Sequence, residues 1–162
     1  MLSGGWDRTI KIWDIRKGGP VGHIFGPELS SDALDIHENT LVTGSFRPKN
    51  SLQFWDWRMC KRLSNIDWEY GLPISENSYL NFARFNINGD GIIAGGKSQE
   101  VKVFDRVTKD DGTHSDEWVQ NSRLGNFGGS LFCCATMHET DHFAVGCGDG
   151  TVKIYTVNTS YS

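Results

Sequence analysis

The chain has 162 residues, 38% of them hydrophobic, and its formal net charge is −4 at pH 7. This length fits one domain of ordinary size. An acidic balance without a basic cluster argues against nucleic-acid or anionic-membrane binding as the main role. The apolar runs are strand-sized and no apolar leader follows Met1, so we expect neither a transmembrane helix nor a signal peptide.

The cysteines indicate the compartment. None of the four forms a C-x-x-C spacing, and they lie in or next to predicted strands: Cys60, Cys133, Cys134 and Cys147. We therefore expect free thiols in a reducing, intracellular environment, cytoplasmic or nuclear.

Four similar segments recur along the chain, and each has an apolar run, a polar turn and a second run that carries an aromatic residue. They are LSGGWDRTIKIWDI from Leu2, LVTGSFRPKNSLQFWDW from Leu41, IIAGGKSQEVKVFDR from Ile92 and FAVGCGDGTVKIYTV from Phe143. The aromatic residues Trp13, Trp55, Phe104 and Tyr155 are 42, 49 and 51 residues apart. Periods of about 40–50 residues with strand-like content are typical of β-propeller blades. The sequence therefore predicts an all-β fold.

In chain order, the predicted strands fall into four parts. Residues 1–26 contain strands at 2–5, 10–15 and 20–25. Residues 27–68 contain strands at 33–36, 41–44, 52–57 and 61–66. Residues 69–125 contain strands at 80–85, 91–95, 101–105 and 118–123. Residues 126–157 contain strands at 131–136, 142–146 and 152–155, and residues 158–162 form a C-terminal tail.

The segment VTKDDGTHSDE, residues 107–117, separates the last two strands of the third part. It is polar and rich in turn-forming residues, so we expect an exposed loop.

The dipeptides Trp13-Asp14 and Trp55-Asp56 resemble the signature of the WD-repeat (WD40) family of β-propellers. In that family a blade has four antiparallel strands, A to D. A Ser or Thr on strand B, an Asp in the B–C turn, a Trp on strand C and a His before strand A form a hydrogen-bonded network. The resemblance implies structural roles for Ser3, Asp7, Trp13, Asp14, Trp55, Asp56, Phe104, Asp105, Asp149 and Tyr155. The middle copies depart from the pattern, with Ser98 in one turn and FRPKN in the other, and the His is missing throughout.

The count is about three and a half blades of an incomplete ring. Exposed end faces and unpaired strand edges invite association. Three interpretations stay open. The chain is the C-terminal half of a larger propeller, or a half-ring that closes with a second copy, or a small ring of its own.

Two patterns superficially indicate metal chemistry. HETDH, from His138 to His142, matches the H-E-x-x-H zinc motif, but that motif requires a helix, and here it lies between two predicted strands. The acidic residues Asp110, Asp111, Asp116 and Glu117 lack EF-hand spacing. We expect no catalytic residue, no metal and no cofactor, and hence no enzyme. A metal-binding enzyme at His138 and His142 is the remote alternative.

The expected partners are other proteins or peptides, with no nucleic acid and no membrane. Trp, Tyr and Arg predominate at interface hot spots. Aromatic and basic residues lie in B–C turns and in the connection after residue 66, and they are the binding candidates: Trp6, Arg8, Phe46, Arg47, Lys49, Trp68 and Tyr70. For Trp6 and Trp68 the alternative is packing over a neighbouring blade.

The expected function is a scaffold that binds through the top face and blade rims. The alternative function is a structural module of a large assembly, for example a cytoskeletal or ciliary one.

Overall fold

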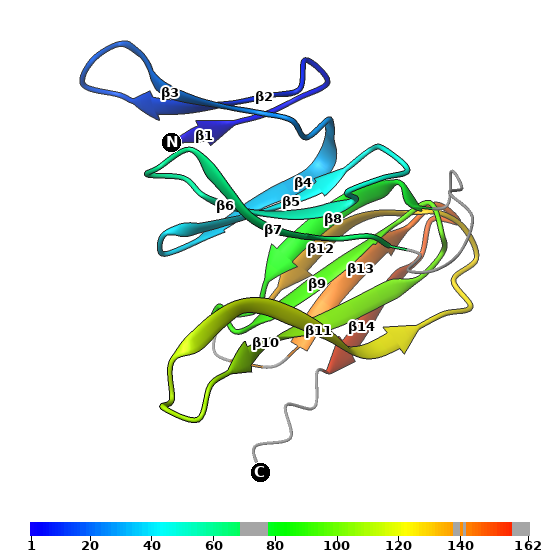
Figure 1. Ribbon diagram of the computed structural model, residues 1–162. Helices are drawn as coiled ribbons and strands as arrows, with labels where there is room; N and C mark the ends of the chain where they lie inside the picture. Colours follow the sequence, from blue (N-terminus) through cyan, green and yellow to red (C-terminus); the bar gives the residue numbers. More distant parts are fainter. Residues whose placement is uncertain (69–77, 138–139, 141, 157–162) are drawn as a thin grey trace.

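The computed structural model describes residues 1–68, 78–137, 140 and 142–156, and its elements there are β-strands (Figure 1). The first unit is an antiparallel sheet of β1 (Leu2–Ser3), β2 (Thr9–Asp14) and β3 (Gly19–Phe25). The fourth unit is an antiparallel sheet of β12 (Leu131–Thr136), β13 (His142–Cys147) and β14 (Val152–Thr156). No helix in these residues is long and apolar enough to cross a membrane.

The two middle units each have four antiparallel strands. The second unit comprises β4 (Leu29–His37), β5 (Thr40–Ser45), β6 (Leu52–Asp56) and β7 (Lys61–Ile66). The third comprises β8 (Leu80–Phe85), β9 (Gly91–Gly96), β10 (Val101–Thr108) and β11 (His114–Leu124). A parallel bridge between β4 and β8 joins them into one curled sheet, in the order β11-β10-β9-β8-β4-β5-β6-β7. The predicted all-β fold of four-stranded antiparallel blades is confirmed.

The hydrophobic core consists of three clusters, each lying between two neighbouring units. In the first three units, the two alternating apolar residues of strand C are buried against the next unit: Ile10 and Ile12, Leu52 and Phe54, Val101 and Val103. The strand-C aromatic points to the other side of its sheet, so Trp55 packs on the first unit with Ile10 and Ile12. Period-two alternation thus gives each of the two middle units two apolar faces, and each face packs on the neighbouring unit.

The strand-C tryptophans donate hydrogen bonds to strand B. Trp13 Nε1 donates to Ser3 Oγ at 2.8 Å, and Trp55 Nε1 donates to Thr43 Oγ1 at 3.1 Å. Only the second pair is buried. Thr43, which precedes Gly44 as Ser3 precedes Gly4, was not among the sequence candidates. In the other units the strand-C aromatic is held by packing, because Phe104 is buried and Tyr155 stacks on Phe143 at 5.6 Å.

Aspartates shape the turns at both ends of strand C. Asp149 accepts hydrogen bonds from the Thr151 hydroxyl and backbone N–H, which lower the pKa of the carboxyl below its ordinary value. Asp7 accepts one from the Thr9 backbone N–H in the equivalent turn. The middle residue of each Asp-x-Thr turn has a positive φ, 83° for Gly150 and 61° for Arg8. Glycine suits this conformation, whereas arginine adopts it at a cost.

Three more aspartates of the predicted structural set lie at the strand-C end. Asp56 accepts hydrogen bonds from the backbone N–H groups of Arg58 and Met59 and so closes the β6–β7 turn. Asp14 binds Arg16, whose guanidinium is the main cause of the lowered pKa of that carboxyl. Asp105 accepts a hydrogen bond from the Asn121 amide across β10 and β11.

The prediction of a loop over residues 107–117 is wrong in extent. β10 continues to Thr108 and β11 starts at His114, so the turn is only residues 109–113. Trp118 of this hairpin stacks on Phe54 of the second unit, with ring centroids 4.9 Å apart and an interplanar angle of 8°. The hairpin therefore gains its strand structure from pairing and from this contact between units, which its polar composition does not reveal.

The inner strands of three units meet. The Ser31 hydroxyl of β4 donates to the Phe132 carbonyl of β12 at 2.9 Å, and the buried Asn81 amide of β8 donates to the Leu131 carbonyl at 2.7 Å. Side-chain hydrogen bonds thus connect the second and third units to the fourth.

Candidate interaction surface

Turns from different units meet at one edge of the molecule, on the right-hand side of Figure 1. The connection 26–28 between β3 and β4 lies between the β1–β2 turn and the β5–β6 turn. Gly26 N donates to the Arg8 carbonyl at 3.0 Å, and Phe46 N donates to the Glu28 carbonyl at 2.8 Å. These backbone hydrogen bonds fix the positions from which the turn side chains project.

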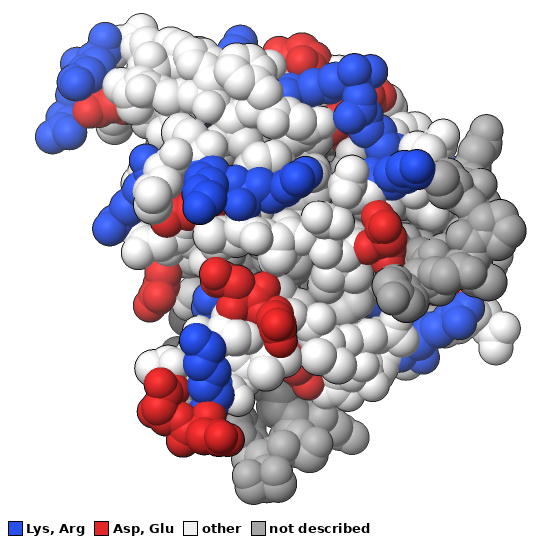
Figure 2. Space-filling model, viewed as in Figure 1, with Lys and Arg blue, Asp and Glu red and all other residues white. Residues whose placement is uncertain are grey.

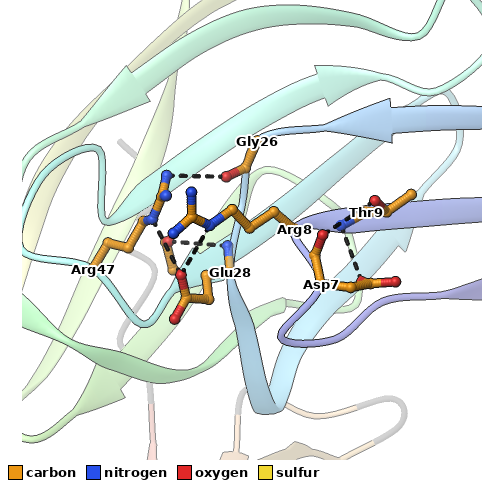
Figure 3. Close-up of polar contacts among 7 residues, drawn as sticks. Asp7, Arg8, Thr9, Gly26, Glu28 and Arg47 are labelled. Carbon is orange, nitrogen blue, oxygen red and sulfur yellow. Dashed lines mark hydrogen bonds and ion pairs between the residues drawn. The ribbon is translucent and has the colours of Figure 1, made fainter.

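A carboxylate lies between two guanidinium groups at this edge (Figure 3). Glu28 Oε2 is 3.3 Å from Arg8 Nε and 3.4 Å from Arg47 Nε. Arg47 Nη1 also donates to the Gly26 carbonyl at 3.4 Å. Figure 3 shows the Arg8 side chain extending toward Glu28, whereas Asp7 faces Thr9. Two cations therefore share one anion, and a positive charge remains.

Three aromatic rings from three units form a row beside this cluster. The rings of Trp6 and Phe46 meet edge to face with centroids 5.1 Å apart, and Phe46 and Tyr79 are 4.7 Å apart. The ammonium group of Lys97 lies over the Tyr79 ring at 5.5 Å. Trp6 is 60% exposed. We call the combined set the aromatic–arginine edge: Trp6, Arg8, Glu28, Phe46, Arg47 and Tyr79.

The structure brings together four of the seven sequence candidates, namely Trp6, Arg8, Phe46 and Arg47. Lys49 is exposed in the same β5–β6 turn, next to Asn50, whose N–H donates to Asp67 Oδ1 at 2.8 Å. Tyr70 lies outside the described residues.

Trp68 does not belong to this exposed set, and its prediction as an exposed binding residue is wrong. It is only 2% exposed, packs in the cluster of Phe54 and Phe104, and donates from Nε1 to Ser98 Oγ at 3.0 Å. Its place in a polar segment concealed this, because burial here depends on the neighbouring units.

Glu28 and Tyr79 were not predicted. Both lie just before the first strand of a unit, Glu28 before β4 and Tyr79 before β8. The position itself is a usable signal, since connections into strand A reach the same edge as B–C turns. Figure 2 shows Lys and Arg side chains gathered at the upper right of the view, over this edge, and carboxylates gathered around the β10–β11 turn.

The metal candidates lack a supporting constellation. Among the residues that the structure places, no group of three or more His, Cys, Asp and Glu side chains is arranged to hold a metal ion. His142 begins strand β13, which excludes the helix that the zinc motif needs at that residue. His138 lies outside the described residues.

Comparison with known proteins agrees with the repeat geometry. The family model "WD domain, G-beta repeat" matches residues 1–14 and 121–156. These two stretches of the chain are similar to WD repeats. The chain is 26% identical over 160 residues to Autophagy-related protein 16 of Arabidopsis thaliana, an alignment covering 98% of the chain and 28% of that protein.

Two further relatives match shorter stretches. The chain is 29% identical over 124 residues to the Periodic tryptophan protein 2 homolog of Schizosaccharomyces pombe, covering 67% of the chain and 14% of that protein. It is 36% identical over 56 residues to Mitochondrial division protein 1 of Aspergillus niger, covering 35% of the chain and 8% of that protein. The chain thus spans less than a third of the length of each of these three relatives.

Proposed function

We propose that this chain is a non-enzymatic module that binds other proteins or peptides through the aromatic–arginine edge. The observation that carries the proposal is an exposed tryptophan beside two arginines. Trp6 is 60% exposed, and the side chains of Arg8 and Arg47 are 60% and 36% exposed. Trp and Arg are the side chains that most often supply binding energy at protein interfaces.

The edge is also well anchored, which favours recognition of a partner. Its residues come from three units, and backbone hydrogen bonds tie the turns to the connection 26–28. A preorganised surface loses little conformational entropy on binding. Glu28 holds both arginines in place, so their guanidinium groups are directed before a partner arrives.

Two further features support the non-enzymatic reading. WD-repeat proteins generally act as interaction scaffolds, and the chain matches that family model. Burial raises the pKa of the Cys134 thiol to about 12, which disfavours its thiolate form at neutral pH. The proposal includes an intracellular location, cytoplasmic or nuclear, which the four free cysteines support.

The test is a selection of peptides from a random displayed library on the purified chain. Selected peptides should lose at least tenfold in affinity on Trp6→Ala, the loss typical of a hot-spot residue. The matched control is Ile15→Ala, which removes an exposed side chain from the β2–β3 turn at the other end of strand C. Peptides that bind Trp6→Ala as well as wild type, or that depend on Ile15, would refute the proposed surface.

A second candidate function is a structural module of a larger assembly. Val152 and Ile154 of β14 are 70% and 66% exposed, whereas the equivalent residues of the other three units are at most 8% exposed. The face they occupy borders a hollow of about 260 Å³ lined by Ala135, Phe143 and Ile154. A further sheet, from another propeller half or from a second copy of the chain, would cover it. Val152→Lys should then reduce the fraction of the chain that sediments as a complex. An unchanged sedimentation profile would contradict this candidate function.

A further inference from the structure

The hydrogen-bonding capacity of the two arginines exceeds what the chain itself uses. A guanidinium has five N–H donors. Arg8 directs its Nε to Glu28, and Arg47 directs its Nε to Glu28 and its Nη1 to the Gly26 carbonyl. Within the part of the chain that the structure describes, the terminal Nη groups of Arg8 bind no other residue. These groups present a pair of donors at a side chain that is 60% exposed.

The net charge of the two arginines and Glu28 is small. Glu28 neutralises one of the two guanidinium charges, so these three side chains together keep about one positive charge. Asp7, which neighbours Arg8 in sequence, accepts the Thr9 N–H instead, and Asp67 accepts the Asn50 N–H. A surplus of one charge suits a single carboxylate.

An apolar platform lies next to these donors. Trp6 and Arg8 belong to the same turn, and the indole meets Phe46 edge to face at an interplanar angle of 71°. This arrangement covers only part of the indole and leaves most of its surface in solvent. A ligand side chain that packs on the indole would therefore have its neighbouring residues within reach of the Arg8 guanidinium.

We infer that the aromatic–arginine edge recognises an acidic peptide segment. One Asp or Glu carboxylate accepts the two Nη donors of Arg8 in the parallel arrangement that arginine forms with carboxylates, and an adjacent apolar side chain packs on Trp6. The inference rests on the proposed function and adds the chemistry of the partner. Glu28 keeps the Arg8 side chain extended, so less side-chain entropy is lost when the ligand binds.

The test uses an array of decapeptides that carry a varied apolar residue next to a fixed Glu, Gln or Lys. We expect the wild-type chain to bind Glu peptides about tenfold more tightly than their Gln counterparts, because a charge-assisted hydrogen bond is lost. Lys peptides should not bind. Raising NaCl from about 50 to about 500 mM should weaken binding of the Glu peptides and leave that of any Gln peptide unchanged.

Two variants connect the effect to Arg8. Arg8→Gly removes the guanidinium at a position whose φ is 61°, and Gly150 occupies the equivalent place at 83°, so the fold should persist. This variant should bind Glu and Gln peptides equally weakly. Arg16→Ala is the control, because Arg16, like Arg8, forms an ion pair with one carboxylate, that of Asp14, but lies in the β2–β3 turn. It should bind like wild type.

The outcomes separate the two proposals. If peptides need Trp6 but ignore the change from Glu to Gln, or keep their preference in Arg8→Gly, the acidic-peptide inference fails and the proposed function stands. If no peptide binds, or none depends on Trp6, both fail. Far-UV circular dichroism and urea midpoints of each variant show whether the fold persists.

Discussion

Replacing Thr43 by Val tests the role of the buried hydrogen bond between strands B and C. The Thr43 hydroxyl accepts from Trp55 Nε1 at 3.1 Å and donates to the Gln53 carbonyl at 3.3 Å. Thr43 is fully buried, and Trp55 is 6% exposed. Valine has nearly the shape of threonine, so the substitution removes hydrogen bonds and creates almost no cavity.

The expected cost follows from what is left behind. The indole N–H would remain buried without its acceptor, and an unsatisfied buried donor costs about 1–3 kcal/mol. Ser3→Ala breaks the equivalent bond to Trp13 in the first unit. That bond is exposed, so water can replace the hydroxyl, and the cost should stay below about 0.5 kcal/mol.

Urea unfolding followed by far-UV circular dichroism would measure both variants, with the slope of free energy against urea checked for constancy. The double variant Thr43→Val with Trp55→Phe removes donor and acceptor together and should cost less than the sum of the single changes. The reasoning fails if Thr43→Val lies within about 0.5 kcal/mol of wild type, or if Ser3→Ala is equally destabilising.

Three further changes probe other features. Trp118→Ala should lower the free energy of unfolding by about 2–3 kcal/mol, because it exposes the ring of Phe54, and an unchanged urea midpoint would contradict that packing role. Ellman's reagent should modify exposed Cys60 within minutes and reach Cys134, whose pKa burial raises to about 12, only after unfolding. The lowered pKa of Asp149 means that its stabilisation is present above the ordinary pKa of 3.8 and is lost as pH falls through the folded-state pKa. The stability difference between wild type and Asp149→Asn should therefore shrink between about pH 5 and pH 2, and a constant difference would refute this linkage.

The strands were largely predictable because their pattern reflects local physics. Alternating apolar residues such as Leu52 and Phe54 must face one side of a strand, and the polar turns between runs mark the strand ends. The β10–β11 hairpin escaped prediction because its pairing partner and the stacking of Trp118 supply the stability that its polar residues do not. Strand length at that point depends on a contact between units.

Four of the six residues of the aromatic–arginine edge were predictable from the sequence. Trp6, Arg8, Phe46 and Arg47 occupy B–C turns, which the repeat places at one edge. Glu28 joins them because the connection into β4 passes between two such turns, so its position before strand A, and not a residue motif, is the signal in the sequence. Trp68 was expected to be exposed and is buried. The origin is the same, since the units on either side of a connection decide whether its residues are buried.

The hydrogen bond from Ser31 to the carbonyl of Phe132 joins residues that are 101 positions apart. Forming it requires closure of a long loop, and the entropic cost of closure rises with the logarithm of loop length. The antiparallel hairpins within each unit close far shorter loops. We therefore expect folding to begin with local hairpins and to bring the inner strands together late. The rate at which the curled sheet forms is then limited by the slow search for contacts distant in sequence.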